Sequence, residues 1–256
     1  MDKTSKKAFL TGASSGIGQA LAPELAARGY DLVLAARRSD SLEQVKQAIA
    51  ARHPQRKVEV LALDVTRYAE TQAAVNEAAR RLGGLDLVIA NAGIGSTGLV
   101  GSGHFDDDRA VIETNVTGAM ATVDAAVALF RAQNRGQIVV ISSVAAMRGL
   151  PTSASYSASK AAIAVYADAV RAELYGTPVR VTTLYPGFID TPINQKLKSR
   201  PFLIGVEQGA RLVADLIERR VQSSTVPVYP WNIVGRLVRV LPTAMLARAA
   251  RKAKPL

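Results

Sequence analysis

The sequence contains no cysteine among its 256 residues, which excludes disulfides, thiolate metal sites and cysteine nucleophiles. Its two histidines, His53 and His104, lie far apart and lack the spacing of metal ligands, so we expect no metal site. Residues 232–256 contain no acid but six lysines and arginines, which supply six of the eleven net positive charges.

Long hydrophobic runs are missing as well. No run reaches the about 18 to 20 apolar residues of a membrane-spanning helix, and residues 1–16 do not resemble a secretion signal. We therefore expect a soluble protein of the cytoplasm. The net charge of +11 would suit binding to nucleic acid. Aromatic residues make up only 5% of the chain, however, and no nucleic-acid-binding motif is present, so we expect no nucleic-acid partner.

Short apolar runs alternate with longer helical patterns along the whole chain. This alternation predicts an α/β fold: a single Rossmann-type, doubly wound domain with a mostly parallel sheet and helices on both faces. We expect a domain over 1–230, with a substrate loop at about 188–206, and a basic amphipathic extension over 231–256. The predicted strands are 7–12, 31–37, 57–65, 85–93, 136–143, 179–187 and 224–230. The predicted helices are 17–29, 40–52, 67–83, 106–132, 154–175 and 207–222.

A glycine-rich segment, TGASSGIG (11–18), follows the first predicted strand. Residues without a Cβ let the backbone approach a pyrophosphate at the start of a helix. The spacing is G-x3-G-x-G rather than the usual G-x-G-x-x-G, and a tight strand-to-helix turn alone is the alternative. Its place in a strand–loop–helix unit favours dinucleotide binding.

The second predicted strand ends in LAARRSD, where we expect the ribose of a bound dinucleotide. Ala36 stands where an NAD enzyme has an acid, and Arg37 and Arg38 follow it. Arginine suits the 2′-phosphate of NADP, and Ser14 in the glycine segment adds a hydroxyl near the same group. The alternative is a solvated arginine pair, and our hypothesis is that NADP(H) is preferred.

Several separate stretches match one pattern: TGASSGIG (11–18), LDV (63–65), NAG (91–93), TNVTG (114–118), IVVISSVAA (138–146), YSASK (156–160) and YPGFIDT (185–191). In this order and rough spacing, from about residue 7 to 191, they resemble the short-chain dehydrogenase/reductase family. One departure is Ala90, where many members have a second asparagine. The resemblance implies a seven-stranded sheet, interconversion of a carbonyl and an alcohol by hydride transfer, and a homodimer or homotetramer.

The resemblance also implies roles for matched residues. Tyr156 would be the general acid or base, Lys160 would tune it and bind the nicotinamide ribose, and Ser143 would bind the substrate oxygen, with Ser142 as the alternative. Asn115 would hold a water that links Lys160 to solvent. Ile189 and Thr191 would lie near the carboxamide, and Asp64 and Val65 near the adenine. With the two arginines, the expected cofactor-binding residues are Gly12, Ser14, Ser15, Gly16, Ile17, Gly18, Arg37, Arg38, Asp64, Val65, Asn91, Ala92, Gly93, Tyr156, Lys160, Pro186, Gly187, Ile189 and Thr191.

The four-residue spacing of Tyr156 and Lys160 places both on one helical face. Lowering a tyrosine pKa by ~3 units requires about 4 kcal/mol. An ammonium about 4 Å away supplies about 4 kcal/mol at an effective dielectric of 20. We therefore expect Lys160 to lower the pKa of Tyr156. A small-residue helix that only packs closely on a neighbour is the alternative.

Substrate choice lies in the loops beyond the strands, and their apolar residues favour a hydrophobic ketone or aldehyde. Residues 231–256 fit a lid or a subunit contact, which we favour, or a membrane surface. A non-catalytic dinucleotide-binding sensor or interaction protein is the alternative to an enzyme, and the presence of Tyr156 and Lys160 argues against it. The apolar loop residues are Met147, Leu150, Phe188, Ile193, Leu197, Phe202 and Leu203.

Overall fold

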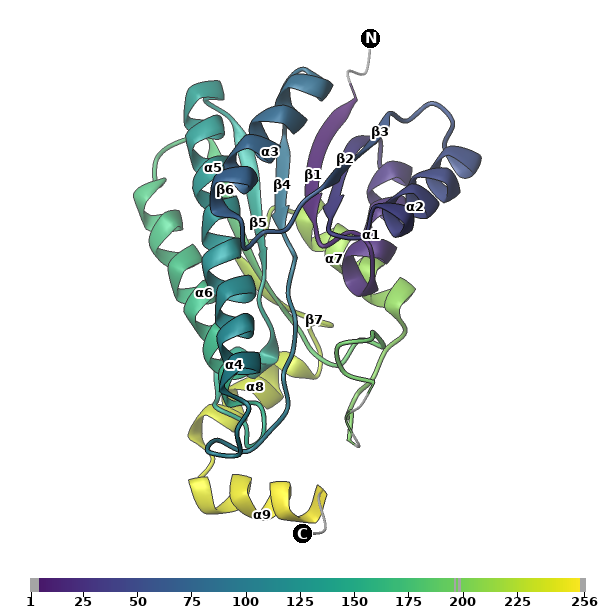
Figure 1. Ribbon diagram of the computed structural model, residues 1–256. Helices are drawn as coiled ribbons and strands as arrows, with labels where there is room; N and C mark the ends of the chain where they lie inside the picture. The colour runs from purple at the N-terminus through teal and green to yellow at the C-terminus, as the bar shows by residue number, and fades with distance from the viewer. Residues whose placement is uncertain (1–4, 196, 198, 254–256) are drawn as a thin grey trace.

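The computed structural model describes residues 5–195, 197 and 199–253. Within them the chain forms a parallel seven-stranded sheet with the strand order β3-β2-β1-β4-β5-β6-β7 (Figure 1). The strands are β1 (Lys6–Thr11), β2 (Tyr30–Ala36), β3 (Val58–Ala62), β4 (Leu87–Ala90), β5 (Gly136–Ile141), β6 (Val179–Pro186) and β7 (Ser223–Val226).

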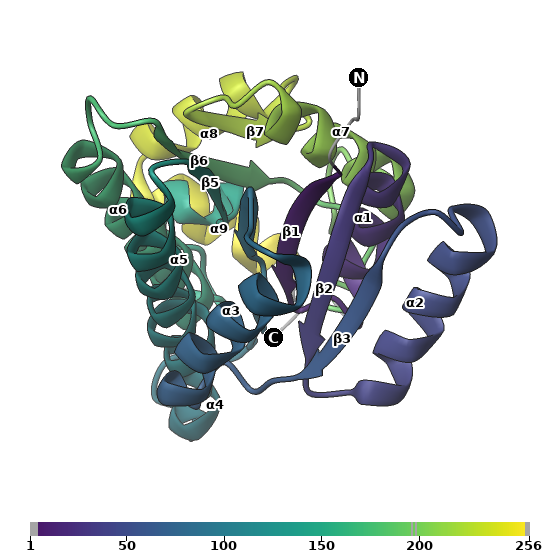
Figure 2. The same ribbon diagram turned by 90° about the horizontal axis from the view of Figure 1, so that it is seen from above.

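Helices cover both faces of this sheet. Helices α1, α2 and α7 lie on one face, and α3, α5 and α6 on the other (Figure 2). The helices are α1 (Gly16–Ala27), α2 (Ser39–Arg52), α3 (Tyr68–Leu82), α4 (Phe105–Ile112), α5 (Ala119–Gln133), α6 (Ala154–Glu173), α7 (Val206–Glu218), α8 (Trp231–Val240) and α9 (Thr243–Ala253). Two short turns complete the set: the π-helical η1 (Glu113–Gly118) and the 3-10 turn η2 (Val144–Met147).

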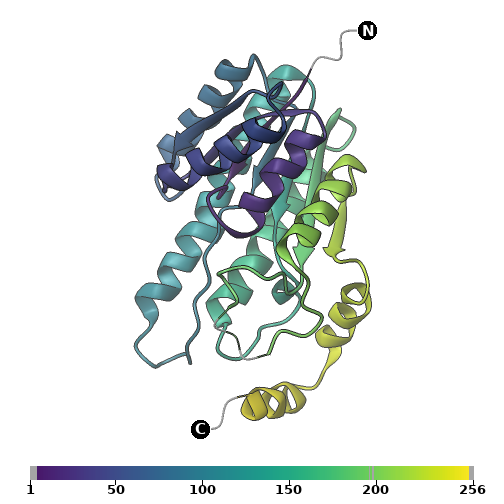
Figure 3. The same cartoon turned by 90° about the vertical axis from the view of Figure 1, so that its right-hand side faces the viewer.

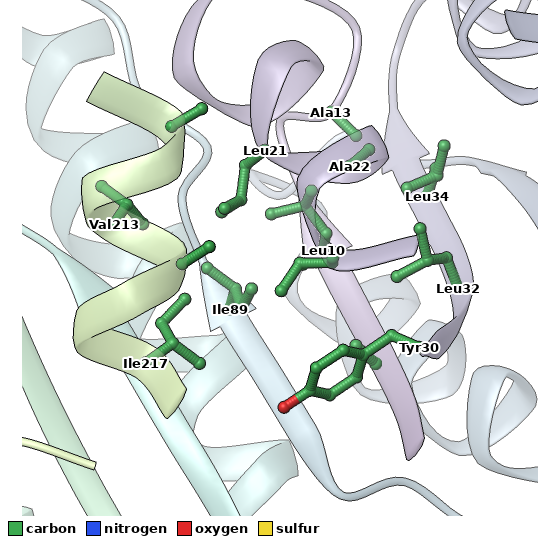
Figure 4. Packing of buried hydrophobic residues seen from close by; sticks show 14 of the residues in the cluster. Leu10, Ala13, Leu21, Ala22, Tyr30, Leu32, Leu34, Ile89, Val213 and Ile217 are labelled. Carbon is green, nitrogen blue, oxygen red and sulfur yellow. The ribbon is translucent and has the colours of Figure 1, made fainter. Parts of the chain in front are cut away.

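The core has two layers because neighbouring residues of a strand point to opposite faces of the sheet. Leu10 of β1 packs toward α1 and α7, beside Leu21 and Ile217 (Figure 4). Phe9, the preceding residue, belongs to the opposite layer with Phe130 of α5. All three of Phe9, Leu10 and Phe130 are fully buried, so the alternation in β1 joins both helical layers to one sheet.

The strand order reverses between β1 and β4, which pair in parallel with Ala8 opposite Leu87. The chain leaves these two strands in opposite directions, toward α1 on one face and toward α4 on the other. A crevice at the carboxyl ends of the strands follows from this switch point and is the usual ligand site of such sheets. The loops after β1, β4, β5 and β6 all open at this end (Figure 1).

The predicted α/β fold and the predicted seven-stranded sheet are both confirmed. The predicted strands 57–65 and 85–93 extend beyond β3 and β4. The last predicted strand, 224–230, is also too long, because β7 ends at Val226 and Pro227 has no N–H for the sheet ladder. The predicted continuous helix 106–132 is interrupted by η1. After the sheet, α8 and α9 extend beyond the carboxyl end, away from the core (Figure 3).

Candidate active site

The turn between β1 and α1 requires glycine at two positions. Gly12 has φ +68°, in the left-handed region. A Cβ at Gly18 would lie 2.4 Å from the carbonyl oxygen of Gly12. Ser15 stands directly before α1, and its side chain caps none of the first N–H groups. Those donors and the positive end of the helix dipole suit a pyrophosphate, so this cradle fits a dinucleotide.

Thr11 and Asn91 hold the ends of β1 and β4 together at this turn. The Thr11 hydroxyl accepts from the N–H groups of Asn91 (3.1 Å) and Ala92 (3.2 Å). The Asn91 amide donates to the carbonyls of Thr11 (2.9 Å) and Gly12 (3.2 Å). Asn91 and Ala92 therefore line the crevice as structural partners of the glycine turn. Sequence reasoning missed Thr11, although it is the first residue of the quoted glycine segment.

The end of β2 gathers the residues expected at the adenosine ribose. Arg38 donates to the Ser14 hydroxyl at 3.2 Å, which joins the arginine pair to the glycine turn. Arg37 is exposed and lies 4.0 Å from the Asp64 carboxylate. Burial acts to raise the pKa of Asp64, but hydrogen bonds from Thr66 and the charge of Arg37 outweigh it and lower the pKa. An anionic Asp64 next to Arg37 offers one charge of each sign where the ribose is expected.

Tyr156 and Lys160 lie on the first two turns of α6, and Lys160 is deeply buried, with 5% of its surface exposed. Its Nζ donates to the carbonyl oxygen of Ile141 at the end of β5 (2.9 Å) and lies 5.9 Å from the centre of the Tyr156 ring. Burial lowers the pKa of Lys160 to about 8. The helix thus presents both groups to the crevice.

The expected lowering of the Tyr156 pKa by Lys160 is wrong for the protein itself. Burial raises the pKa of Tyr156, and a hydrogen bond with Ser143 opposes this only in part. The reason is geometric: Lys160 bonds Ile141 rather than approaching the phenol. Desolvation of the phenolate therefore dominates.

Ser143 stands at the carboxyl end of β5, where η2 begins. Its hydroxyl accepts from the Ala145 N–H (3.1 Å) and lies 3.4 Å from the Pro186 carbonyl oxygen, to which it donates. Ser142 instead donates to the main-chain carbonyl of Lys160 at 2.7 Å and fastens α6 to the sheet. Of the two serines, Ser143 is the one whose hydroxyl acts on the pKa of Tyr156, which it lowers.

Asn115 lies in the π-helical turn η1 and is 1% exposed. Its Oδ1 accepts from the Ile94 N–H (2.8 Å), and its Nδ2 donates to the Ile94 carbonyl (2.8 Å) and the Ser159 hydroxyl (3.1 Å). A Cβ at Gly93 would lie 3.2 Å from Asn115 Oδ1 and 3.3 Å from Lys160 Nζ. The side chain therefore clamps the loop after β4 to α6 beside Lys160.

The segment after β6 runs back to the glycine turn. Thr191 is buried, and a Cβ at Gly16 would lie 3.4 Å from it. Ile189 is also buried, and its side chain packs toward α7, where a Cβ at Gly209 would lie 2.7 Å from it. Only the main chain of Ile189 is thus available to a ligand, whereas Thr191 lies against the cofactor turn.

Trp231, the first residue of α8, is the principal residue of this region that sequence reasoning did not select. Its ring contacts those of Phe188 (5.8 Å between centroids) and Phe202 (5.7 Å). Its indole nitrogen lies against Gly187, and among the described residues it has no hydrogen-bond partner. The three rings form an aromatic group beside the end of β6.

Helix α8 also touches the turn that carries Ser143. A Cβ at Gly235 would lie 2.1 Å from the sulfur of Met147 in η2. Arg148, next along the chain, donates to the Arg239 carbonyl (3.0 Å) and the Thr243 hydroxyl (3.3 Å), joining α8 to α9. The first half of the expected extension is therefore packed onto the site.

A separate cleft of 530 Å³ lies between α6 and α9. It is lined by Leu150, by Ala158 and Ala161 of α6, and by Leu246 of α9, and neither Tyr156 nor Lys160 lines it. Its lining includes Ala146 of η2 and Ser157 of α6, so it lies beside the residues that carry Ser143 and Tyr156. Among the described residues no His, Asp and Glu side chains gather as a metal site, and no helix is long and apolar enough to span a membrane.

A glycine turn lies at the topological switch point, a serine follows β5, and a tyrosine and a lysine lie on α6. This arrangement is typical of an oxidoreductase that binds a dinucleotide. Residues 6–201 match the family model described as short chain dehydrogenase. The chain belongs to the short-chain dehydrogenase/reductase family and is an oxidoreductase of that type.

Two relatives cover nearly the whole chain. An uncharacterized oxidoreductase of Mycobacterium tuberculosis is 38% identical over 248 residues, 96% of this chain and 98% of the relative. Another, from Myxococcus xanthus, is 37% identical over 250 residues, 96% of this chain and 97% of that protein. The similarity therefore includes α8.

Solved structures agree on the fold. A short chain dehydrogenase/reductase from Burkholderia phymatum in complex with NAD superposes with a TM-score of 0.83 at 25% identity, covering 97% of this chain and 96% of that one. An alcohol dehydrogenase from Thermococcus sibiricus complexed with 5-hydroxy-NADP gives 0.78 at 28% identity, covering 86% and 95%. The ligand thus differs between similar structures.

Proposed function

We propose that this protein is an NADP(H)-dependent oxidoreductase that interconverts a hydrophobic ketone or aldehyde and the corresponding alcohol. The observation that carries the proposal is that Ser143, whose hydroxyl acts on the pKa of Tyr156, lies with Tyr156 and the buried Lys160 at the carboxyl end of the sheet. We also propose that the chain works in the cytoplasm. Its oligomeric state would be a homodimer or homotetramer, as the family resemblance implies.

The preference for NADP(H) rests on the end of β2. The uncharged Ala36 stands where an NAD enzyme has an acid. Arg37 is exposed, and Arg38 donates a hydrogen bond to the Ser14 hydroxyl in the glycine turn. Two guanidinium groups at this point suit a 2′-phosphate. Asn91, Gly93 and Thr191 then line the path of the cofactor toward Tyr156.

When bound, the dinucleotide supplies the hydride for reduction of the carbonyl carbon. Tyr156 donates its phenolic proton to the carbonyl oxygen as that oxygen gains negative charge. The raised pKa of Tyr156 keeps the phenol protonated and ready for this step. Ser143 holds the same oxygen through its hydroxyl. Lys160 would bind the nicotinamide ribose, as the family resemblance implies.

The substrate class follows from the walls of the crevice. Trp231, Phe188 and Phe202 form an aromatic group at the end of β6, and Met147 lies under α8 on the side of Ser143. Apolar walls with one reactive polar group are typical of sites for small hydrophobic ligands. We therefore expect aromatic or long-chain carbonyl compounds to react faster than sugars.

The test compares the wild type with Tyr156→Phe in a panel of ketones, aldehydes and 3-oxoacyl thioesters, followed by the loss of NADPH absorbance. Tyr156→Phe should lower turnover by about 100- to 10,000-fold, because general acid catalysis is lost. Its NADPH dissociation constant should stay within about twofold, because the ring remains. The matched control is Tyr175→Phe, whose ring is 92% exposed.

Near-normal turnover of Tyr156→Phe would remove the proposed acid. A wild type that binds NADPH tightly but reduces no carbonyl in the panel would instead support the binding-only alternative.

A further inference from the structure

Helix α8 carries two apolar faces, and only one of them is packed. The inner face places Trp231 against Gly187 and Gly235 against Met147. The outer face exposes Ile233 (51%), Leu237 (57%) and Val240 (77%). These three residues follow the i, i+4, i+7 spacing of one helical stripe. The inner face accounts for the attachment of α8, and the outer stripe needs a different explanation.

Exposed apolar side chains also lie near the start of α8, but on the side of Trp231 rather than of the outer stripe. Phe202, which is 53% exposed, contacts Trp231, and Leu203 beside it is 39% exposed. Single exposed apolar residues are ordinary, but a stripe of them along one face of a helix marks an interaction surface.

Charge identifies the kind of partner. Arg236 and Arg239 are exposed on α8 beside the apolar stripe, and residues 231–256 contain no acid. If a second copy docked on this face by two-fold symmetry, its Arg236 and Arg239 would lie close to the same arginines of the first copy. The repulsion between these like charges would oppose such a dimer. An apolar stripe flanked by arginines instead complements the headgroups and acyl chains of an anionic bilayer.

We infer that the outer face of α8, with its exposed Ile233, Leu237 and Val240 and the neighbouring Arg236 and Arg239, docks on an anionic phospholipid surface. The docking is argued from this surface alone. Its consequence, that the enzyme lies where a hydrophobic substrate is concentrated, rests on the proposed function.

The experiment sediments the full chain with vesicles of phosphatidylcholine alone or with added phosphatidylglycerol, at low and at physiological salt. We expect binding to the anionic vesicles only, weakened by salt. Each basic side chain near an anionic surface strengthens binding by about fivefold, so Arg236→Gln with Arg239→Gln should lower the partition coefficient by about 25-fold. The matched control is Arg52→Gln with Arg219→Gln, which removes two exposed arginines at the ends of α2 and α7.

A second variant tests the apolar stripe. Leu237→Ser should lower partitioning by about tenfold, because a half-exposed leucine no longer enters the acyl region. Light scattering of the same samples without vesicles measures self-association. Equal binding by the arginine variant and its control, equal binding to both vesicle types, or no binding overturns the inference. Self-association that Leu237→Ser abolishes, without vesicle binding, assigns the stripe to a second copy and also overturns it.

Catalysis is followed separately with a water-soluble ketone. A chain that sediments with anionic vesicles but oxidises no NADPH leaves the docking in place while the proposed function fails. A chain that reduces the soluble ketone but binds no vesicle gives the opposite result.

Discussion

Trp231 lies so close to Gly187 that a Cβ at Gly187 would be 2.0 Å from the indole nitrogen. This contact joins α8, near the end of the chain, to the end of β6, where the cofactor is expected. Because Trp231 is the only tryptophan in the sequence, its fluorescence reports on this junction alone.

The first prediction concerns Gly187→Ala. The added methyl would collide with the indole, and such overpacking costs about 1 to 3 kcal/mol of unfolding free energy. Displacement of the ring should also shift its emission to longer wavelength. The matched control is Gly149→Ala, where a Cβ meets nothing within 4 Å. Equal stability and equal emission of the two variants would contradict the observed packing.

The second prediction concerns Thr11, whose hydroxyl accepts from two N–H groups at the β1–β4 junction. Thr11→Val keeps the shape but leaves both donors unpaired, which should lower the unfolding free energy by about 2 to 4 kcal/mol. The same change should weaken cofactor binding, because the glycine turn loses its support. Thr11→Ser keeps the acceptor and should restore most of both values. Urea unfolding and NADPH titration measure them, and equal losses in Val and Ser would refute the role.

The third prediction concerns the buried Lys160. Its pKa is lowered to about 8 in the folded protein, while an unfolded lysine stays protonated up to about pH 10.4. Between these values the unfolded state binds more protons, so stability rises with pH over this window. Relative to Lys160→Met, the wild type should gain about 3 kcal/mol between pH 7.5 and 10.5. Parallel pH profiles of the two proteins in urea unfolding would show that Lys160 keeps its ordinary pKa.

The fourth prediction separates NADP from NAD. Arg37→Asp should raise the dissociation constant for NADPH by about 10- to 100-fold, because a charge-assisted hydrogen bond to the 2′-phosphate is lost. Binding of NADH, which lacks this phosphate, should change by less than about threefold. Arg52→Asp, at the far end of α2, is the control for net charge. An equal loss for both cofactors would refute the proposed 2′-phosphate contact.

The secondary structure could be predicted because its signals are local. Leu10 and Phe9 alternate between the two core layers within one short apolar run, and the four-residue spacing of Tyr156 and Lys160 requires only a helix. The interruption at Asn115 could not be predicted in this way. A π-helical turn adds one residue to an otherwise continuous helical pattern, and the periodicity on either side looks the same.

The tail shows the limit of sequence reasoning on packing. The alternation of Ile233, Leu237 and Arg236 indicated an amphipathic segment but left its partner open. The fold decides that Trp231 and Gly235 face the site, because Gly187 and Met147 have come to the same end of the sheet. The outer stripe of Ile233, Leu237 and Val240 is the apolar part of α8 that these contacts leave exposed.

The sequence by itself determined the family, the alternating fold, the glycine turn and the residues available for acid–base chemistry, since each depends on short-range spacing. Only the tertiary structure decided the hydrogen bond of Lys160 to Ile141, the raised pKa of Tyr156 and the contact of Trp231 with Gly187. These depend on atoms brought together from distant parts of the chain. Desolvation and close packing arise only from those long-range contacts, and no local pattern encodes their distances.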